Sequence, residues 1–108
     1  MSSYVLIESR DPFESTGFSQ RCELAAALVA DGASVTLFLL ENGVLAARKA
    51  ARTRPLEQVG RAGISVLADE FALRERGIAV AELVHPVKPV SLDALVERLG
   101  SGARVIWN

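Results

Sequence analysis

The chain has 108 residues, half of them apolar, and a formal net charge of −1. This composition excludes a disordered chain and a strongly charged one, and the overall charge does not favour DNA or RNA as a partner. The one cysteine excludes an internal disulfide, and neither a secretion signal nor an apolar run of membrane-spanning length is present, so we expect a cytoplasmic protein. A short chain leaves roughly a third or more of its unfolded surface exposed, which favours a homo-oligomer.

Apolar strand patterns alternate with helical segments along the whole chain. Unbroken apolar runs such as residues 4–7 and 35–40 are typical of strands in a sheet that is covered on both faces. Right-handed crossovers then give a single α/β domain, residues 1–108, with a doubly wound, mostly parallel sheet of four to five strands and helices on both faces. The predicted strands are residues 4–7, 35–40, 64–68, 80–84 and 104–107.

Four helices are predicted between these strands. Residues 18–31 have an apolar arc on a helical wheel, and a second helix begins near Pro55 and stops at Gly63. Asp69 is expected to cap a short helix over residues 70–76, which Gly77 ends in a left-handed conformation. Ser91 is expected to cap the last helix, residues 92–99, which Gly100 ends.

Ligands of such sheets gather at the carboxyl ends of the strands, and Cys22 lies near the first of these ends. If Ser19 is the N-cap of the helix, Cys22 falls in the first turn, where the helix dipole stabilises a thiolate. If the helix starts near Ser15, Cys22 lies a turn further in, about 40° from the centre of the apolar arc. An inert, buried cysteine is then the simpler interpretation.

Other chemical signals are weak. No glycine-rich phosphate-binding motif is present, and one cysteine with one histidine gives neither a zinc site nor a clear Cys–His pair, so no metal and no cofactor are predicted. His85 is interpreted as structural or merely exposed. Asp69 and Glu70 could act as acid and base, but capping by Asp69 explains them better.

Four cations fall within seven residues: Arg48, Lys49, Arg52 and Arg54. They could dock an acidic partner or an RNA backbone, although a solvated helix face is the commoner explanation of such a run.

Three stretches of the chain resemble the DsrE/DsrF/DsrH superfamily. They are Ser9-Arg10-Asp11-Pro12-Phe13-Glu14, the segment Leu39-Leu40-Glu41-Asn42-Gly43-Val44-Leu45-Ala46-Ala47, and the third strand with the following helix, residues 64–78. The nearest similarity is to DsrH/TusB-like subunits, which can have a cysteine at the beginning of the first helix, a location that Cys22 matches to within about a residue. DsrE-type members have their sulfur-accepting cysteine in the segment that matches residues 68–76, and this chain has no cysteine in that segment.

The resemblance implies a small α/β subunit of a trimer or hexamer, or of a hetero-oligomer with related subunits, that relays persulfide sulfur in sulfur oxidation or tRNA thiolation. A sulfur-carrier protein is then a possible partner. The chain would be a carrier or accessory subunit rather than a complete catalyst.

Three hypotheses remain open. In the first, Cys22 carries a transient persulfide, which requires an accessible thiol. In the second, the chain is a non-catalytic assembly or docking subunit with an inert Cys22, and the cations Arg48, Lys49, Arg52 and Arg54 meet a partner. In the third, a strand-end crevice near Glu8, Arg10, Asn42, Gly43 and Asp69 binds a small molecule.

Overall fold

The computed structural model describes residues 2–13, 17–49 and 54–107. Strands and helices alternate along these residues as the sequence predicts. The strands are β1 (Ser3–Glu8), β2 (Ser34–Leu39), β3 (Ser65–Asp69), β4 (Lys88–Val90) and β5 (Arg104–Trp107). The helices are α1 (Gly17–Ala30), the 3-10 helix η1 (Glu41–Ala47), α2 (Arg54–Arg61), α3 (Glu70–Glu75), the 3-10 turn η3 (Val80–Glu82) and α4 (Asp93–Gly100).

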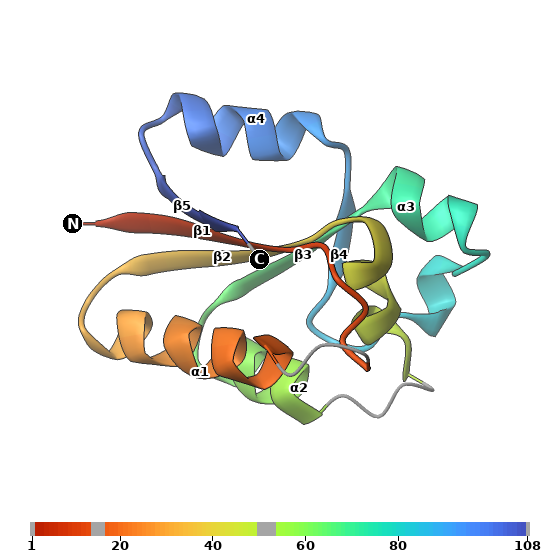
Figure 1. Ribbon diagram of the computed structural model, residues 1–108, viewed down its shortest axis with the longest axis horizontal. Helices are drawn as coiled ribbons and strands as arrows, with labels where there is room; N and C mark the ends of the chain where they lie inside the picture. The colour runs from red at the N-terminus through yellow and green to blue at the C-terminus, as the bar shows by residue number, and fades with distance from the viewer. Residues whose placement is uncertain (1, 14–16, 50–53, 108) are drawn as a thin grey trace.

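The five strands form one parallel sheet in the order β4-β3-β2-β1-β5. The chain steps outward from β1 to β4 and then returns across the sheet to add β5 beside β1. The outward crossovers place α1 and α2 on one face of the sheet, and the return places α4 on the other (Figure 1). This is the doubly wound arrangement that the alternation predicts.

Each face of the sheet has its own apolar core because successive strand residues point to opposite faces. In β1, Leu6 packs with Phe18, Cys22 and Ala25 of α1, whereas its neighbours Val5 and Ile7 pack in a second cluster with Leu95 of α4. The central strands β1, β2 and β3 are therefore apolar on both sides, as their unbroken apolar runs indicate. None of the described helices is both long and apolar enough to span a membrane.

The predicted signals around α3 are confirmed. The backbone N–H of Ala72 donates to Asp69 Oδ2 at 3.2 Å, so Asp69 caps the helix. Gly77 has a φ of 66°, and the N–H of Ile78 returns to the carbonyl of Leu73 at 2.9 Å. These contacts satisfy the carbonyl groups that the end of the helix leaves free.

The fourth strand is the main error of the sequence prediction. Residues 80–84 are not a strand: Val80–Glu82 form a 3-10 turn, and Leu83 makes only an isolated bridge with Arg48. The actual β4 lies further on, at Lys88–Val90, and contains Pro89. Proline lacks a backbone donor, which argues against a central strand, but β4 is at the edge of the sheet, where that donor is not needed.

The ends of α4 also differ from the prediction. Asp93 is the first helical residue, and Leu92 stands at the N-cap with no side-chain capping bond. Gly100 is the last helical residue, and Gly102 takes the left-handed conformation with a φ of 88°. The last helix is therefore shifted by one residue toward the carboxyl end.

Candidate functional site

Cys22 lies inside α1 rather than at its start. The helix is already regular at Gly17, so the interpretation of Ser19 as N-cap is wrong and Cys22 is not in the first turn. Its side chain is 6% exposed and belongs to the core cluster between α1 and the sheet. Cys22 is a free thiol. Because it lies beyond the first turn, the positive end of the helix dipole does little to stabilise its thiolate.

Burial raises the pKa of the Cys22 thiol from 9.0 to about 12. Burial is the largest cause of this rise, and the negative charges of Glu8 and then of Glu23 supply the rest of it. Both causes disfavour the thiolate, which is the nucleophilic form of cysteine. At neutral pH roughly one thiol in 10⁵ would be ionised in this state, so the isolated domain does not provide an activated thiol.

A cavity of about 260 Å³ opens beside Cys22, between α1 and α2. Ser19, Glu23 and Ala26 line it from α1, and Pro55, Gln58 and Val59 line it from α2. The thiol is therefore buried at the wall of a partly open cavity whose other lining residues include the exposed Ser19, Glu23 and Gln58.

Glu8 was not singled out as a buried site from the sequence, yet it is 0% exposed at the end of β1. Arg21 of α1 faces it, with 3.9 Å between Arg21 Nε and Glu8 Oε2. Arg21 Nε itself is buried and has no hydrogen-bond partner among the described residues. Arg21 is thus directed to Glu8, and it is not among the causes that shift the pKa of its neighbour Cys22.

The residues predicted to form a strand-end crevice already have structural roles. Asn42 Oδ1 accepts hydrogen bonds from Arg76 Nε at 3.2 Å and Arg76 Nη2 at 2.9 Å, and Asp69 caps α3. A Cβ on Gly43 would overlap the carbonyl oxygen of Glu8, so only glycine lets η1 approach β1 this closely. Arg10 is exposed. Ligand binding by these residues stays a prediction.

The predicted cationic face is not formed by one helix. Helix η1 ends at Ala47, Arg48 is held in the bridge to Leu83, and Lys49 is exposed. Arg52 lies outside the described residues, and Arg54 begins α2, where its side chain is not described. The interpretation of the run as a solvated helix face is therefore wrong for Arg48, which forms a bridge to Leu83, whereas Lys49 is exposed and helical but separated from η1 by that bridge.

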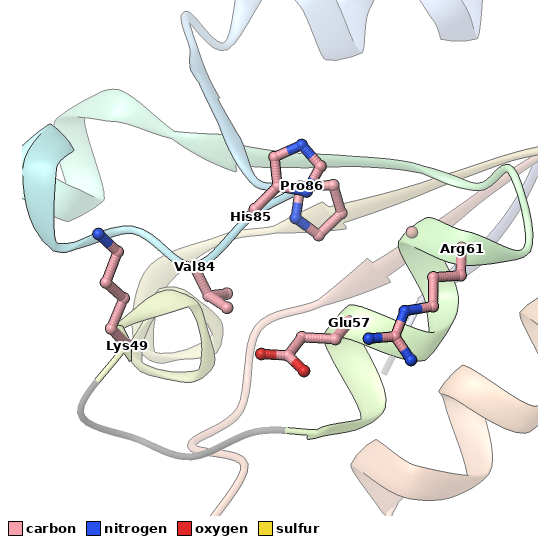
Figure 2. A pocket seen from close by; sticks show the side chains of 7 residues that line it. Lys49, Glu57, Arg61, Val84, His85 and Pro86 are labelled. Carbon is pink, nitrogen blue, oxygen red and sulfur yellow. The ribbon is translucent and has the colours of Figure 1, made fainter.

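Lys49 instead borders a cavity of about 510 Å³ with residues from two other segments. Glu57, Gly60 and Arg61 come from α2, and Val84, His85 and Pro86 come from the segment before β4. Figure 2 shows Lys49 and Arg61 on opposite sides of Val84 and Pro86. His85, predicted to be structural or merely exposed, is exposed and lines this cavity.

No group of three or more His, Cys, Asp or Glu side chains is arranged to hold a metal ion anywhere in the part of the chain that the structure describes.

Comparisons with known proteins agree with this geometry. The model of the DsrE/DsrF-like family matches residues 2–107. The crystal structure of the ychN protein from E. coli superposes with a TM-score of 0.91 at 21% identity, over 100% of both chains. MTH1491 from Methanobacterium thermoautotrophicum, titled a protein of unknown function, gives a TM-score of 0.87 at 19% identity over 100% of both chains.

A third solved structure is similar over nearly its whole length. BT1422 from Bacteroides thetaiotaomicron, titled a conserved protein of unknown function, gives a TM-score of 0.79 at 17% identity, over 99% of this chain and 95% of that one. No curated protein matches the chain significantly. At these identities the solved structures establish the fold alone.

Proposed function

Because the chain belongs to the DsrE/DsrF-like family over residues 2–107, we propose that it serves a sulfur-relay system as a non-catalytic assembly and docking subunit. The observation that carries this proposal is the state of its one thiol. Cys22 is 6% exposed and its pKa is raised to about 12, so the subunit by itself lacks a reactive persulfide acceptor. A cytoplasmic location and a sulfur-carrier protein as partner belong to the same proposal.

The proposal is tested by intact mass after incubation of the native protein with a low-molecular-weight persulfide. We expect no one-sulfur adduct on the native chain, and we expect one after denaturation, when Cys22 is exposed. In a relay reconstituted with its partners, Cys22→Ala should leave the rate of sulfur transfer unchanged. A one-sulfur adduct on the native chain that is absent from Cys22→Ala and passes to a carrier protein would overturn the docking function.

The cavity beside Cys22 favours a second candidate function, that of a persulfide carrier. A volume of about 260 Å³ leaves room for an added sulfur atom and for the end of a donor. In that case the Cys22 thiolate attacks the outer sulfur of a donor persulfide R–S–SH, the R–S⁻ thiolate leaves, and Cys22 keeps the sulfane sulfur as a persulfide. The DsrH/TusB-like affiliation rests on a cysteine in the first helix, which α1 has at Cys22 although not at its start, and this affiliation stays a prediction.

Assembly is supported by exposed apolar side chains on α4 and β5. Leu92, Val96 and Leu99 recur at helical spacing along α4, and Val105 and Trp107 are exposed on β5. β5 is also an edge strand, whose free backbone groups can pair with another chain. We propose that further copies of this chain, in a trimer or hexamer, cover this α4–β5 surface.

Light scattering on the purified protein tests the assembly. Val96 is 60% exposed, so Val96→Lys should lower the molar mass without unfolding the chain. Val80→Lys is the matched control, because Val80 is 67% exposed but lies in η3, away from α4 and β5. Equal molar masses for the wild type and Val96→Lys would exclude the α4–β5 surface as the interface.

A further inference from the structure

Two cavities meet on the side of α2 that faces the segment before β4. The first, of about 510 Å³, is the one that Lys49, Arg61 and His85 line. The second, of about 430 Å³, lies at the amino ends of β3 and β4 and is lined by Lys88 and Arg98 among others. Both include Gly60 and Pro86 in their walls, so the two cavities adjoin, and together they are here called the basic groove.

The basic groove concentrates positive charge in a chain whose net charge is −1. Lys49, Arg61 and Lys88 are exposed cations contributed by three separate segments, and Glu57 is the one acidic side chain among the described lining residues. Arg98 adds a fourth cation, held half-buried by hydrogen bonds to Thr36 Oγ1 at 3.2 Å and to the Ala94 carbonyl at 3.3 Å. A local excess of one sign attracts ligands of the opposite sign.

The exposed charges of the groove are available to a ligand. Within residues 2–13, 17–49 and 54–107, the side chains of Lys49, Arg61 and Lys88 make no hydrogen bond or ion pair. The side chains of Glu57 and His85 likewise make none in that part of the chain. By contrast, the half-buried Arg76 is already bound to Asn42. Binding in the groove would therefore not require any of these internal contacts to break.

We propose that the basic groove binds an extended acidic segment of a partner protein. Its acidic side chains meet Lys49, Arg61 and Lys88, and its apolar side chains contact Val84 and Pro86. A peptide fits better than RNA, because the described lining offers apolar walls at Val84 and Pro86, and among the described lining residues His85 alone has a ring on which a base could stack. The inference goes beyond the sulfur-relay proposal and does not depend on the chemistry of Cys22.

Fluorescence anisotropy tests the groove with a labelled peptide in which glutamate and valine alternate. We expect binding that weakens with added salt and is absent for the peptide in which lysine replaces glutamate. Arg61→Glu and Lys88→Glu should each weaken binding about tenfold, because each turns an attraction into a repulsion. Glu57→Gln should strengthen it, because it removes a repulsion from the same groove.

Arg74→Glu is the matched control, because Arg74 is an exposed cation on α3 and lines neither cavity. It should leave the affinity unchanged, and all four variants should keep the thermal midpoint of the wild type.

Absence of binding, or equal weakening by Arg74→Glu, would overturn the proposal. Tighter binding of an oligouridylate than of the acidic peptide would instead make the groove an RNA site. None of these outcomes bears on persulfide transfer, so the two proposals can fail separately.

Discussion

Helix α2 borders two cavities that differ in size and charge. Toward α1, Pro55, Gln58 and Val59 line the smaller cavity, beside the buried thiol of Cys22. Toward the segment before β4, Glu57, Gly60 and Arg61 border the larger basic groove, which is open and charged. Solvent decides the difference: water keeps the exposed side chains ionised, whereas burial keeps the thiol neutral. The cavity toward α1 therefore has a thiol that solvent hardly reaches, whereas the basic groove is open to solvent but has no thiol.

The largest expected effect concerns the rate at which Cys22 reacts. A shift of the pKa from 9.0 to about 12 lowers the thiolate fraction about a thousandfold at neutral pH. Native Cys22 should therefore react with iodoacetamide at least about a thousandfold more slowly than in the urea-unfolded chain. The rate should rise about tenfold per pH unit up to pH 12. Native and unfolded rates within tenfold of each other would remove the contrast between the two cavities.

The same shift predicts how stability depends on alkaline pH. The folded-state pKa of Cys22 is raised above its unfolded value of 9.0, so the contribution of the neutral thiol to the free energy of unfolding is fully present below pH 9. Above pH 9 the unfolded chain loses this proton while the folded chain keeps it, so the free energy of unfolding falls by up to about 1.4 kcal/mol per pH unit toward pH 12. Urea unfolding of wild type and Cys22→Ala measures it. A Cys22→Ala curve with the same slope above pH 9 would contradict the prediction.

A pair of glycine substitutions tests the wall of the basic groove. A Cβ on Gly60 of α2 would overlap the ring of Pro86, whereas one on Gly100 of α4 meets nothing within 4 Å. Gly60→Ala should cost about 1–3 kcal/mol of unfolding free energy through overpacking. Gly100→Ala should be stabilising by about 0.5–1 kcal/mol, because alanine is the better helix former. Thermal and urea unfolding measure the change in stability for each variant. If both variants changed the free energy of unfolding in the same direction, Pro86 would not pack on α2.

The smallest expected effect separates the causes of the raised thiol pKa. Burial is the largest cause, followed by Glu8 and then by the exposed Glu23. Glu8→Gln should increase the native reaction rate of Cys22 by less than about tenfold, and Glu23→Gln should increase it less still. In both variants the pKa should stay above 9.0, because burial is unchanged. A rate that reached the unfolded value in either folded variant would mean that charge, not burial, controls the thiol.

Local patterns were enough to predict most of the elements. The apolar runs of β1, β2, β3 and β5 and the capping signals of Asp69 and Gly77 act between residues close in sequence, and all were placed correctly. The segment before β4 was misread because its apolar residues resemble a strand pattern. Whether such a segment joins a sheet depends on what lies beside it in space, which its own residues do not specify.

The sequence by itself determined the α/β class, the parallel sheet with two covered faces, and membership of the DsrE/DsrF-like family, because periodicity, turn chemistry and family motifs are local properties of the chain. The tertiary structure decided how deeply Cys22 is buried and which way its pKa moves. It also brought Lys49, Arg61 and Lys88 into one groove. Burial and electrostatic fields are sums over elements far apart in the sequence, so no single stretch of it specifies them.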